Sequence, residues 1–538
     1  MVITTEGLQF LCELFAVKID NIIYCSLVSF DSARTICFSS YLKSGVWTEE
    51  QYHAAYTELF KQYGKLTRKV SYDSNEKNPT KTVISGTLQW VDDYDQTHPL
   101  QYVAVEIWDS LRSQKLTTVT TNSLGFYSFS FYDTLPHRTY RIRVYPGGDY
   151  ANTQDIYGEG YFYQSDPEPK VLLGSSVNFS VVFPMNSDMN KAFQISQAVI
   201  TAARYYEAME GTSLPKVDII YPYSREDYDA TFFYLPDRVN IKDRLSPYSN
   251  QPSSYASWDA IMHEYGHHVA KYMDIENNPG GNHYFELNQA EGLRNKDKGM
   301  RLAWGEAYPS IFALLAQNYY SSSLNSIFTV GDTIYTPSDA PKCNLESIAY
   351  VFGDGCEGAV AGVLWDLFDN SSTETHDTIS MGHSSFWSLV TDSGAVTMFD
   401  FVCHFMSTQS ISAQRKLSVL LSYYMIAPFY LDYEVTASTA SFSWKAGGTS
   451  PVDYLNNSFD LVFCNADQEE VFRIEYLSFY EPPSKPPANC QYTLTAAEYA
   501  TIKNACGNTF GFYVVAFQTD APATGLYESE YITVSIPN

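Results

Sequence analysis

The feature that most constrains this chain is the pentapeptide His263-Glu264-Tyr265-Gly266-His267. Two histidines four residues apart lie on one face of a helix, one turn from each other, so both imidazoles can reach a single ion. The glutamate after the first histidine projects beside that ion, where a general base for a water molecule is needed. The pattern predicts a divalent-metal site with His263 and His267 as ligands and Glu264 as the base.

The residues around the pentapeptide have the features of a capped helix. Ser257 is a suitable N-cap, and Asp259 stands in the first turn, where a negative charge favours the helix dipole. Apolar residues that could bury one face of this helix are Ile261, Met262, Val269, Ala270 and Met273. The alternative interpretation is a helix whose histidines belong to the surface or the core and hold no ion.

The third metal ligand decides the subclass of site. A metzincin continues as H-E-x-x-H-x-x-G-x-x-H, but Ala270 and Met273 stand at its glycine and third-histidine positions, which excludes that class. Glu306 is the one acidic residue in the apolar run 302–316. An unpaired buried carboxylate is strongly unfavourable, whereas a carboxylate on a divalent cation is compensated. We therefore predict Glu306 as the third ligand; the alternative is a solvated residue at a helix start.

These motifs together resemble the gluzincin zinc metallopeptidases, the broad thermolysin-like class with two histidines and one glutamate on zinc. The resemblance covers roughly residues 186–431. It rests on H-E-Y-G-H, on W-G-E-A about forty residues later, and on the apolar helix at 358–369. It implies a mainly helical catalytic domain in which His263, His267 and Glu306 hold zinc and Glu264 activates the water.

Two further residues are candidates for orienting the predicted histidine ligands. Thermolysin carries an aspartate four residues after its third ligand, and this aspartate orients a zinc histidine; here Ser310 stands at that place. Ligating histidines need an acceptor for the second ring nitrogen. Asp366, in the predicted helix 355–370, is the candidate for this support, and a helix-surface carboxylate is the alternative.

By the same resemblance, His383 occupies the place along the chain where a thermolysin-like enzyme keeps an oxyanion-stabilising histidine. His376 and Tyr350 are rivals for that role. Residues 238–241 precede the zinc helix, where thermolysin-like folds place an edge strand, so we expect substrate backbone to pair there. No G-x-M-E-N exopeptidase signature precedes His263, which favours an endopeptidase.

Two stretches of alternating apolar and polar residues flank the helical part. Residues 82–184 resemble a carboxypeptidase regulatory-like (transthyretin-like) module, and residues 433–538 resemble a fibronectin type III-like module; both are β-sandwiches. The predicted fold class is multidomain α+β, with a mainly helical gluzincin-type catalytic domain over 185–432 between the two modules. Residues 1–81 form an uncertain, partly helical segment, with a capping box at Thr48 and Gln51.

Net charge and hydropathy exclude some classes of binding partner. The 538 residues hold 34 Lys and Arg against 61 Asp and Glu, a net charge of −27, which excludes nucleic acid as a partner. We expect no membrane span, because no apolar run is long enough. Nine cysteines leave at least one unpaired, and the spacings of Cys343/Cys356 and Cys490/Cys506 would close short loops. The N-terminus has no recognisable signal peptide.

The sequence thus predicts a zinc-dependent endopeptidase acting on extracellular proteins or peptides. Two β modules around a peptidase favour a secreted or cell-surface protein, and these modules are candidates for binding a surface polymer. The alternative is a catalytically inert adhesive or carbohydrate- or protein-binding surface protein. The intact set of His263, Glu264, His267 and Glu306 argues against that alternative.

Overall fold

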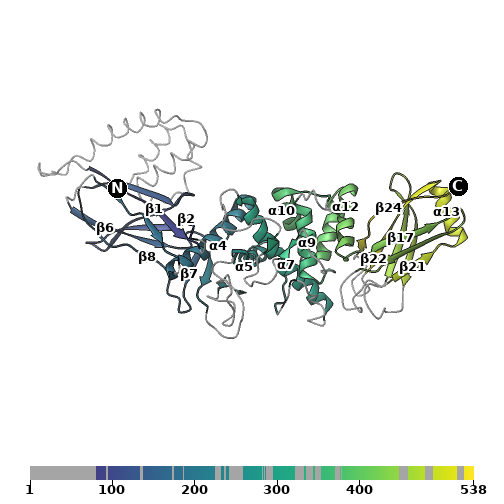
Figure 1. The fold of residues 1–538 in the computed structure, drawn as a ribbon, viewed down its shortest axis with the longest axis horizontal. Coiled ribbons are helices and arrows are strands. Elements are labelled where there is room, and N and C mark those ends of the chain that lie inside the picture. Colours follow the sequence, from purple (N-terminus) through teal and green to yellow (C-terminus); the bar gives the residue numbers. More distant parts are fainter. Residues whose placement is uncertain are drawn as a thin grey trace, which may run out of the picture. The chain divides into compact units, whose positions relative to one another are not determined.

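The computed structural model has a mixed α+β fold, in which strand-rich regions precede and follow a helical region along the chain (Figure 1). Residues 80–538 form one compact unit. The predicted capping box at Thr48 and Gln51 lies outside the described residues. The structure describes residues 80–92, 95–133, 137–172, 175–185, 187–223, 232–234, 238–241, 258–281, 283, 285, 295–321, 333–334, 343–345, 353–369, 376, 378–447, 458–478, 489–517 and 526–537.

The first strand-rich region contains two five-stranded sheets. At the centre of one sheet, β1 (Thr80–Val91) pairs with β2 (Thr97–Pro99), β5 (Phe126–Asp133), β10 (Ser176–Asn178) and β11 (Val181–Phe183). The other sheet contains β4 (Gln114–Thr120), β3 (Ala104–Asp109), β6 (His137–Tyr145), β8 (Tyr163–Gln164) and β9 (Glu168–Leu172). Along β3 buried and partly exposed residues alternate strictly, as a strand with one face on a core requires.

A four-stranded sheet joins this region to the helices. Its order is β13 (Phe232–Tyr234), β14 (Arg238–Asn240), β12 (Val217–Ile220) and β7 (Ala151–Gln154). Although β7 belongs to the expected sandwich, it pairs parallel with β12, so this sheet crosses the expected 184/185 boundary. The prediction of an edge strand at 238–241 is wrong, because β14 pairs on both sides. Among the described residues, the outer strands of this sheet are β7 and the antiparallel β13.

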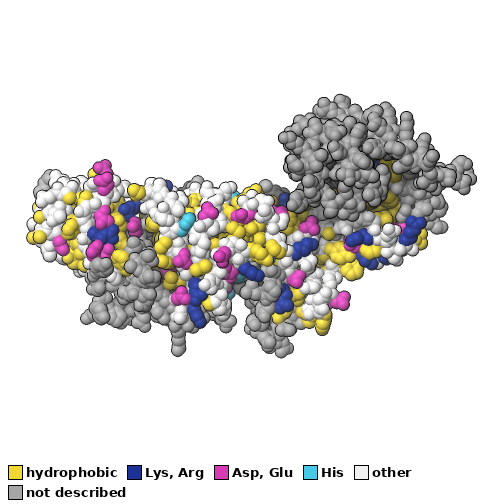
Figure 2. Space-filling view, turned by 180° about the vertical axis from the view of Figure 1, so that it is seen from behind, with side chains coloured by type: hydrophobic (Ala, Val, Ile, Leu, Met, Phe, Trp, Pro, Cys, Tyr) yellow, Lys and Arg dark blue, Asp and Glu magenta, His cyan; other side chains and the backbone are white. Residues whose placement is uncertain are grey.

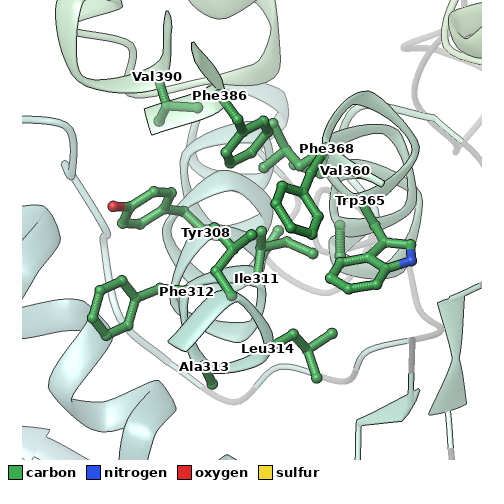
Figure 3. Packing of buried hydrophobic residues seen from close by; sticks show 14 of the residues in the cluster. Tyr308, Ile311, Phe312, Ala313, Leu314, Val360, Trp365, Phe368, Phe386 and Val390 are labelled. Carbon is green, nitrogen blue, oxygen red and sulfur yellow. The ribbon is translucent and has the colours of Figure 1, made fainter. Parts of the chain in front are cut away.

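The helical region is built around α7 (Lys296–Tyr319). This helix is buried without a break from Leu302 to Gln317 and packs against α4 (Asp188–Glu210), α5 (Trp258–Tyr272) and α9 (Glu357–Phe368). Figure 3 shows Ile311 of α7 in the same apolar cluster as Phe368 of α9 and Phe386 of α10 (Gly382–Ser393). A helix buried all round cannot tolerate a charged side chain without a partner. Glu306 lies within this buried stretch, so its charge needs partners.

The remaining helices lead to the C-terminal module. After α11 (Met398–Thr408), α12 (Ile411–Tyr423) is followed by β17 (Phe429–Val435), which crosses the expected 432/433 boundary. The module contains β18 (Ala440–Lys445), β19 (Ser458–Cys464), β20 (Glu470–Ser478), β21 (Asn489–Thr493), α13 (Ala496–Cys506), β22 (Thr509–Phe517), β23 (Leu526–Glu528) and β24 (Ile532–Ser535). Cys490 and Cys506 are free thiols, so the expected disulfide between them is not formed.

The chain is acidic, with a net charge of −27. On the face drawn in Figure 2, acidic and basic side chains are interspersed with apolar ones. Among the described helices, none has both the length and the apolar character needed to cross a bilayer.

Candidate metal centre

The site forms where α5 and α7 approach each other most closely. A Cβ added at Gly266 would lie 2.7 Å from the Cα of Pro309, so only glycine permits this helix spacing. A second close approach lies one turn earlier on α7, where a Cβ on Gly305 would meet the side chain of Asn278 at 2.8 Å. The glycine inside the pentapeptide thus brings the backbone of α7, and with it Glu306, up to the two histidines.

The three predicted ligands converge on one point. The Nε2 atom of His263 is 3.2 Å from Oε2 of Glu306, and the Nε2 atom of His267 is 3.4 Å from the same oxygen. One ligand atom from each of the three residues lies within 4.8 Å of the others. Two atoms bound to a tetrahedral zinc ion at about 2.1 Å are about 3.4 Å apart. The spacing of these donors therefore fits a shared ion.

The Nδ1 atom of each of the two predicted histidine ligands lies at hydrogen-bond distance from another side chain. The Nδ1 atom of His263 lies 2.9 Å from Oγ of Ser310, and that of His267 lies 2.9 Å from Oε1 of Glu276. A ring whose Nδ1–H donates to an acceptor presents the lone pair of Nε2 to the ion. Ser310, which stands where thermolysin has an aspartate, therefore orients a histidine through its hydroxyl group.

Asp366 does not take the supporting position predicted for it. It accepts a hydrogen bond from the hydroxyl of Tyr424 at 3.1 Å, and His376 Nε2 lies 3.6 Å away. Glu276 provides the carboxylate that holds His267 instead. The sequence signal that could have found Glu276 is its place just beyond the end of the helix that carries His267, within reach of the last turns.

Glu306 is a buried carboxylate with both oxygens engaged. Its Oε2 faces the histidines, and its Oε1 accepts from Nδ2 of Asn278 at 2.8 Å. Burial alone would raise the pKa of Glu306, but the positive charge of His267 and the hydrogen bonds from both histidines hold the pKa well below its usual range. Burial would likewise lower the pKa of His267, but Glu306 and Glu276 raise it well above the usual value. The pocket is built to keep an anionic carboxylate beside positive charge.

Glu264 lies at the same pocket and is only 8% exposed. Burial raises the pKa of this carboxyl, while the nearby charges of His263 and His267 lower it; the net change is upward. A carboxylate in a dry site next to cationic groups has the properties of a general base that can also return the proton. The structure thus places all four residues of the predicted set together.

A third histidine, His283, which sequence reasoning missed, reaches the same carboxylate. The Nε2 atom of His283 lies 3.4 Å from Oε2 of Glu306, and its Nδ1 lies 3.0 Å from Oε2 of Glu357, the first residue of α9. Burial on its own would lower the pKa of His283, but the hydrogen bond to Glu357 and the charge of Glu306 raise it to about 9. His283 follows two glycines in a stretch without periodicity, and its partner is 74 residues away, so no local pattern marks the pair.

His383, predicted as the oxyanion donor, lies elsewhere. Its Nδ1 is 3.2 Å from the hydroxyl of Tyr205, and its Nε2 is 3.2 Å from Oδ1 of Asn318. Asn318 is twelve residues beyond Glu306 on α7, which is about 18 Å along the helix axis. The structure therefore does not bring His383 to the pocket. Of its rivals, His376 stacks on Tyr423, and Tyr350 lies outside the described residues.

Comparisons with known proteins leave the activity open. No family model matches the chain. An uncharacterized protein of Archaeoglobus fulgidus is 25% identical over 197 residues, which are 34% of this chain and 48% of that protein. The match thus spans about half the length of this relative.

Two solved structures show a weak likeness. One is described as a "putative carbohydrate binding protein" from Pseudomonas aeruginosa; it has 14% identity and a TM-score of 0.13, and the match covers 21% of this chain and 92% of that one. The other is a 9R-lipoxygenase from Cyanothece, with 10% identity and a TM-score of 0.14, matched over 89% of this chain and 46% of that one. At these TM-scores neither likeness bears on fold or activity.

Proposed function

We propose that this protein is a zinc-dependent peptidase of the gluzincin kind, in which His263, His267 and Glu306 hold the ion and Glu264 is the general base. The observation that carries the proposal is the convergence of two Nε2 atoms on one oxygen of Glu306, at 3.2 and 3.4 Å. Two imidazoles and one carboxylate form the donor set of catalytic zinc, which leaves a coordination position for water, whereas structural zinc is enclosed by four protein ligands.

The residues of the pocket divide the chemistry between them. Zinc, when bound, supplies a Lewis acid that polarises the scissile carbonyl and acidifies a water molecule. Glu264 takes the proton from the attacking water and passes it to the leaving amine. The imidazole of His283, held by Glu357, donates to the carbonyl oxygen as that oxygen becomes negative. His283 thus takes the role that the sequence assigned to His383.

The four-stranded sheet offers a place for the substrate backbone. Helix α5 packs against β13 and β14, and among the described residues β13 is the outer strand on this side of the sheet. An extended peptide that pairs with an edge strand gains main-chain hydrogen bonds, and these do not depend on the side chains of the peptide. We propose that peptide substrates bind along β13, beside the helix that carries Glu264. Binding of an extended stretch from the middle of a substrate chain fits an endopeptidase. The flanking β modules fit a secreted or cell-surface location.

The decisive experiment combines metal analysis with digestion of a peptide mixture. The wild-type chain should contain one zinc ion and cleave peptides, with loss of cleavage on chelation and recovery on adding zinc. Glu264→Gln should keep the zinc and lower kcat/KM by about a thousandfold, the order expected for loss of a general base. Asp297→Asn, at an exposed carboxylate in the first turn of α7, is the matched control and should change neither.

Two outcomes would contradict the proposal. Cleavage that survives Glu264→Gln would remove the assigned mechanism. A wild-type chain that binds zinc and cleaves no peptide in the mixture would favour the inert binding protein instead.

A further inference from the structure

We propose that Tyr527, in the C-terminal module, is a positioning residue for the His283–Glu357 pair. The module would then be part of the catalytic apparatus, and not a spacer or a binding appendage alone. The catalytic consequence of this inference rests on the proposed function, but the positioning itself can be measured without any activity. It is carried by a continuous series of contacts from β23 to the metal pocket.

The first link is the attachment of the His283 segment to the start of α9. Glu357 holds the imidazole of His283 at 3.0 Å, and the backbone N–H of Gly358 donates to the carbonyl of Phe285 at 2.9 Å. The thiol of Cys356 lies 3.6 Å from the same carbonyl oxygen. The first N–H groups of a helix have no partner within the helix. Here one of them binds the segment, so the position of the first turn of α9 decides where His283 points.

The second link is the turn that precedes α9. The N-cap residue, Cys356, makes no side-chain cap hydrogen bond to the first turn of the helix. The turn is held by backbone hydrogen bonds instead. The N–H of Cys356 donates to Gly353 at 3.1 Å, and the N–H of Gly353 donates to Tyr424 at 2.9 Å. Within this turn the side chain of Asp354 is fully buried.

The third link reaches the C-terminal module. The hydroxyl of Tyr527 donates to Oδ2 of Asp354 at 2.8 Å, and both residues are 0% exposed. Burial and the neighbouring carboxylate of Asp354 raise the pKa of Tyr527 well above its usual value, so the hydroxyl keeps its proton for this bond. A buried carboxylate that loses such a donor loses a charge-assisted hydrogen bond, which is costly. Tyr527 therefore fixes the turn from outside the helical region.

Tyr527 is itself held firmly against the helices. Its ring meets that of Phe399 in α11 edge to face, with centroids 5.9 Å apart. The next residue, Glu528, pairs with Arg415 of α12 at 3.1 Å, and the N–H of Glu530 donates to Ser422 at 3.3 Å. This end of the module is thus anchored on α11 and α12 at several points. Such an anchor can transmit position to Asp354, which a loosely tethered module could not.

The test uses Tyr527→Phe in the full-length chain. The matched control is Tyr492→Phe, which removes a tyrosine hydroxyl bonded to Glu498 within the same module. We expect Tyr527→Phe to lower kcat about tenfold, with KM and zinc content close to those of the wild type. Hydrogen exchange of the amides of residues 353–358 should become about tenfold faster, while Tyr492→Phe leaves both kcat and this exchange unchanged. Equal behaviour of the two variants would overturn the inference.

A double-mutant cycle separates positioning from general loss of stability. If Tyr527 acts through Glu357, the kcat losses of Tyr527→Phe and Glu357→Gln are not additive, whereas those of Tyr492→Phe and Glu357→Gln are. Additive losses in the first pair would overturn the inference. Should Tyr527→Phe not fold, Asp354→Asn removes the charge at the same contact and takes its place.

Failure of the two proposals can be told apart. A wild-type chain without peptidase activity would remove the proposed function, yet faster exchange at residues 353–358 in Tyr527→Phe would still support the positioning role. Unchanged exchange at these residues in an active enzyme would remove the positioning role alone.

Discussion

Histidines of opposite character contact the buried helix α7 at two places, around Glu306 and near its C-terminal end at Asn318. Around Glu306, the rings of His263, His267 and His283 meet carboxylates within 3.4 Å. Near the C-terminal end, His383 is bonded to the neutral groups of Tyr205 and Asn318 and lies among aromatic rings. Carboxylates raise the pKa of His267, whereas burial lowers the pKa of His383.

The comparison teaches that the partner of an imidazole, more than its burial, decides what the imidazole can do. A ring held by a carboxylate is oriented and made more basic, so it can bind an ion or donate to a developing anion. A ring that is bonded to neutral groups and surrounded by aromatic rings contributes to packing, and its nitrogens only make hydrogen bonds to those neutral groups. The two places on α7 therefore predict opposite responses to the same substitution.

The largest contrast is expected from removing the imidazole at each place. His283→Gln should lower kcat about 100- to 1,000-fold, the order measured for loss of one oxyanion donor, while zinc stays bound. The matched variant His383→Gln should leave kcat within about twofold of the wild type. Steady-state kinetics and metal content measure both. Loss of zinc in His283→Gln would show that His283 is a fourth ligand, and loss of activity in His383→Gln would erase the contrast.

A smaller effect is expected from the groups that orient the ligands. Glu276→Ala should weaken zinc binding about 10- to 100-fold, because Nδ1 of His267 loses its acceptor. Asp366→Asn is the control, since Asp366 bonds Tyr424 instead of a ligand. Competition with a chromophoric chelator gives the affinities. Equal affinity for zinc in Glu276→Ala and the wild type would mean that this carboxylate does not support the site.

The smallest expected effect is the contribution of His383 to the pH dependence of the free energy of unfolding. Burial lowers the pKa of His383 below its usual value of 6.5. The unfolded chain then binds this proton more readily than the folded one, so His383 destabilises the fold as the pH falls below about 6.5. The wild type should therefore lose more stability than His383→Gln between pH 7.5 and pH 5.5. Chemical denaturation at the two pH values measures this difference, and parallel losses would contradict it.

Much of the metal pocket was predictable because its signals are local. The spacing of His263 and His267 follows from 3.6 residues per turn, so their shared face needs no knowledge of the rest of the chain. Glu306 could be found because a lone carboxylate in an apolar helical run demands a partner. The alternating segments likewise predicted most strands of the two β modules, such as β3 and β18.

Other features depend on contacts between segments that are far apart in the chain, and no local sequence pattern indicates these contacts. Residues 238–241 form a strand, as predicted, but only the order of the sheet shows that β13 lies outside it. Position along the chain suggested His383 as the oxyanion donor, whereas the structure brings His283 to Glu306 and places His383 beside Asn318. Asp366 was the expected support for a ligand, whereas Glu276 holds His267.

By itself, the sequence determined which residues can bind an ion and which segments form helices or strands, because periodicity and the cost of burying charge act within a few turns. Only the tertiary structure decided which groups complete the pocket. His283 and Glu357 are 74 residues apart, and Asp354 and Tyr527 are 173 residues apart. Contacts of this kind arise when helices and modules pack, and packing leaves no periodic trace in either segment.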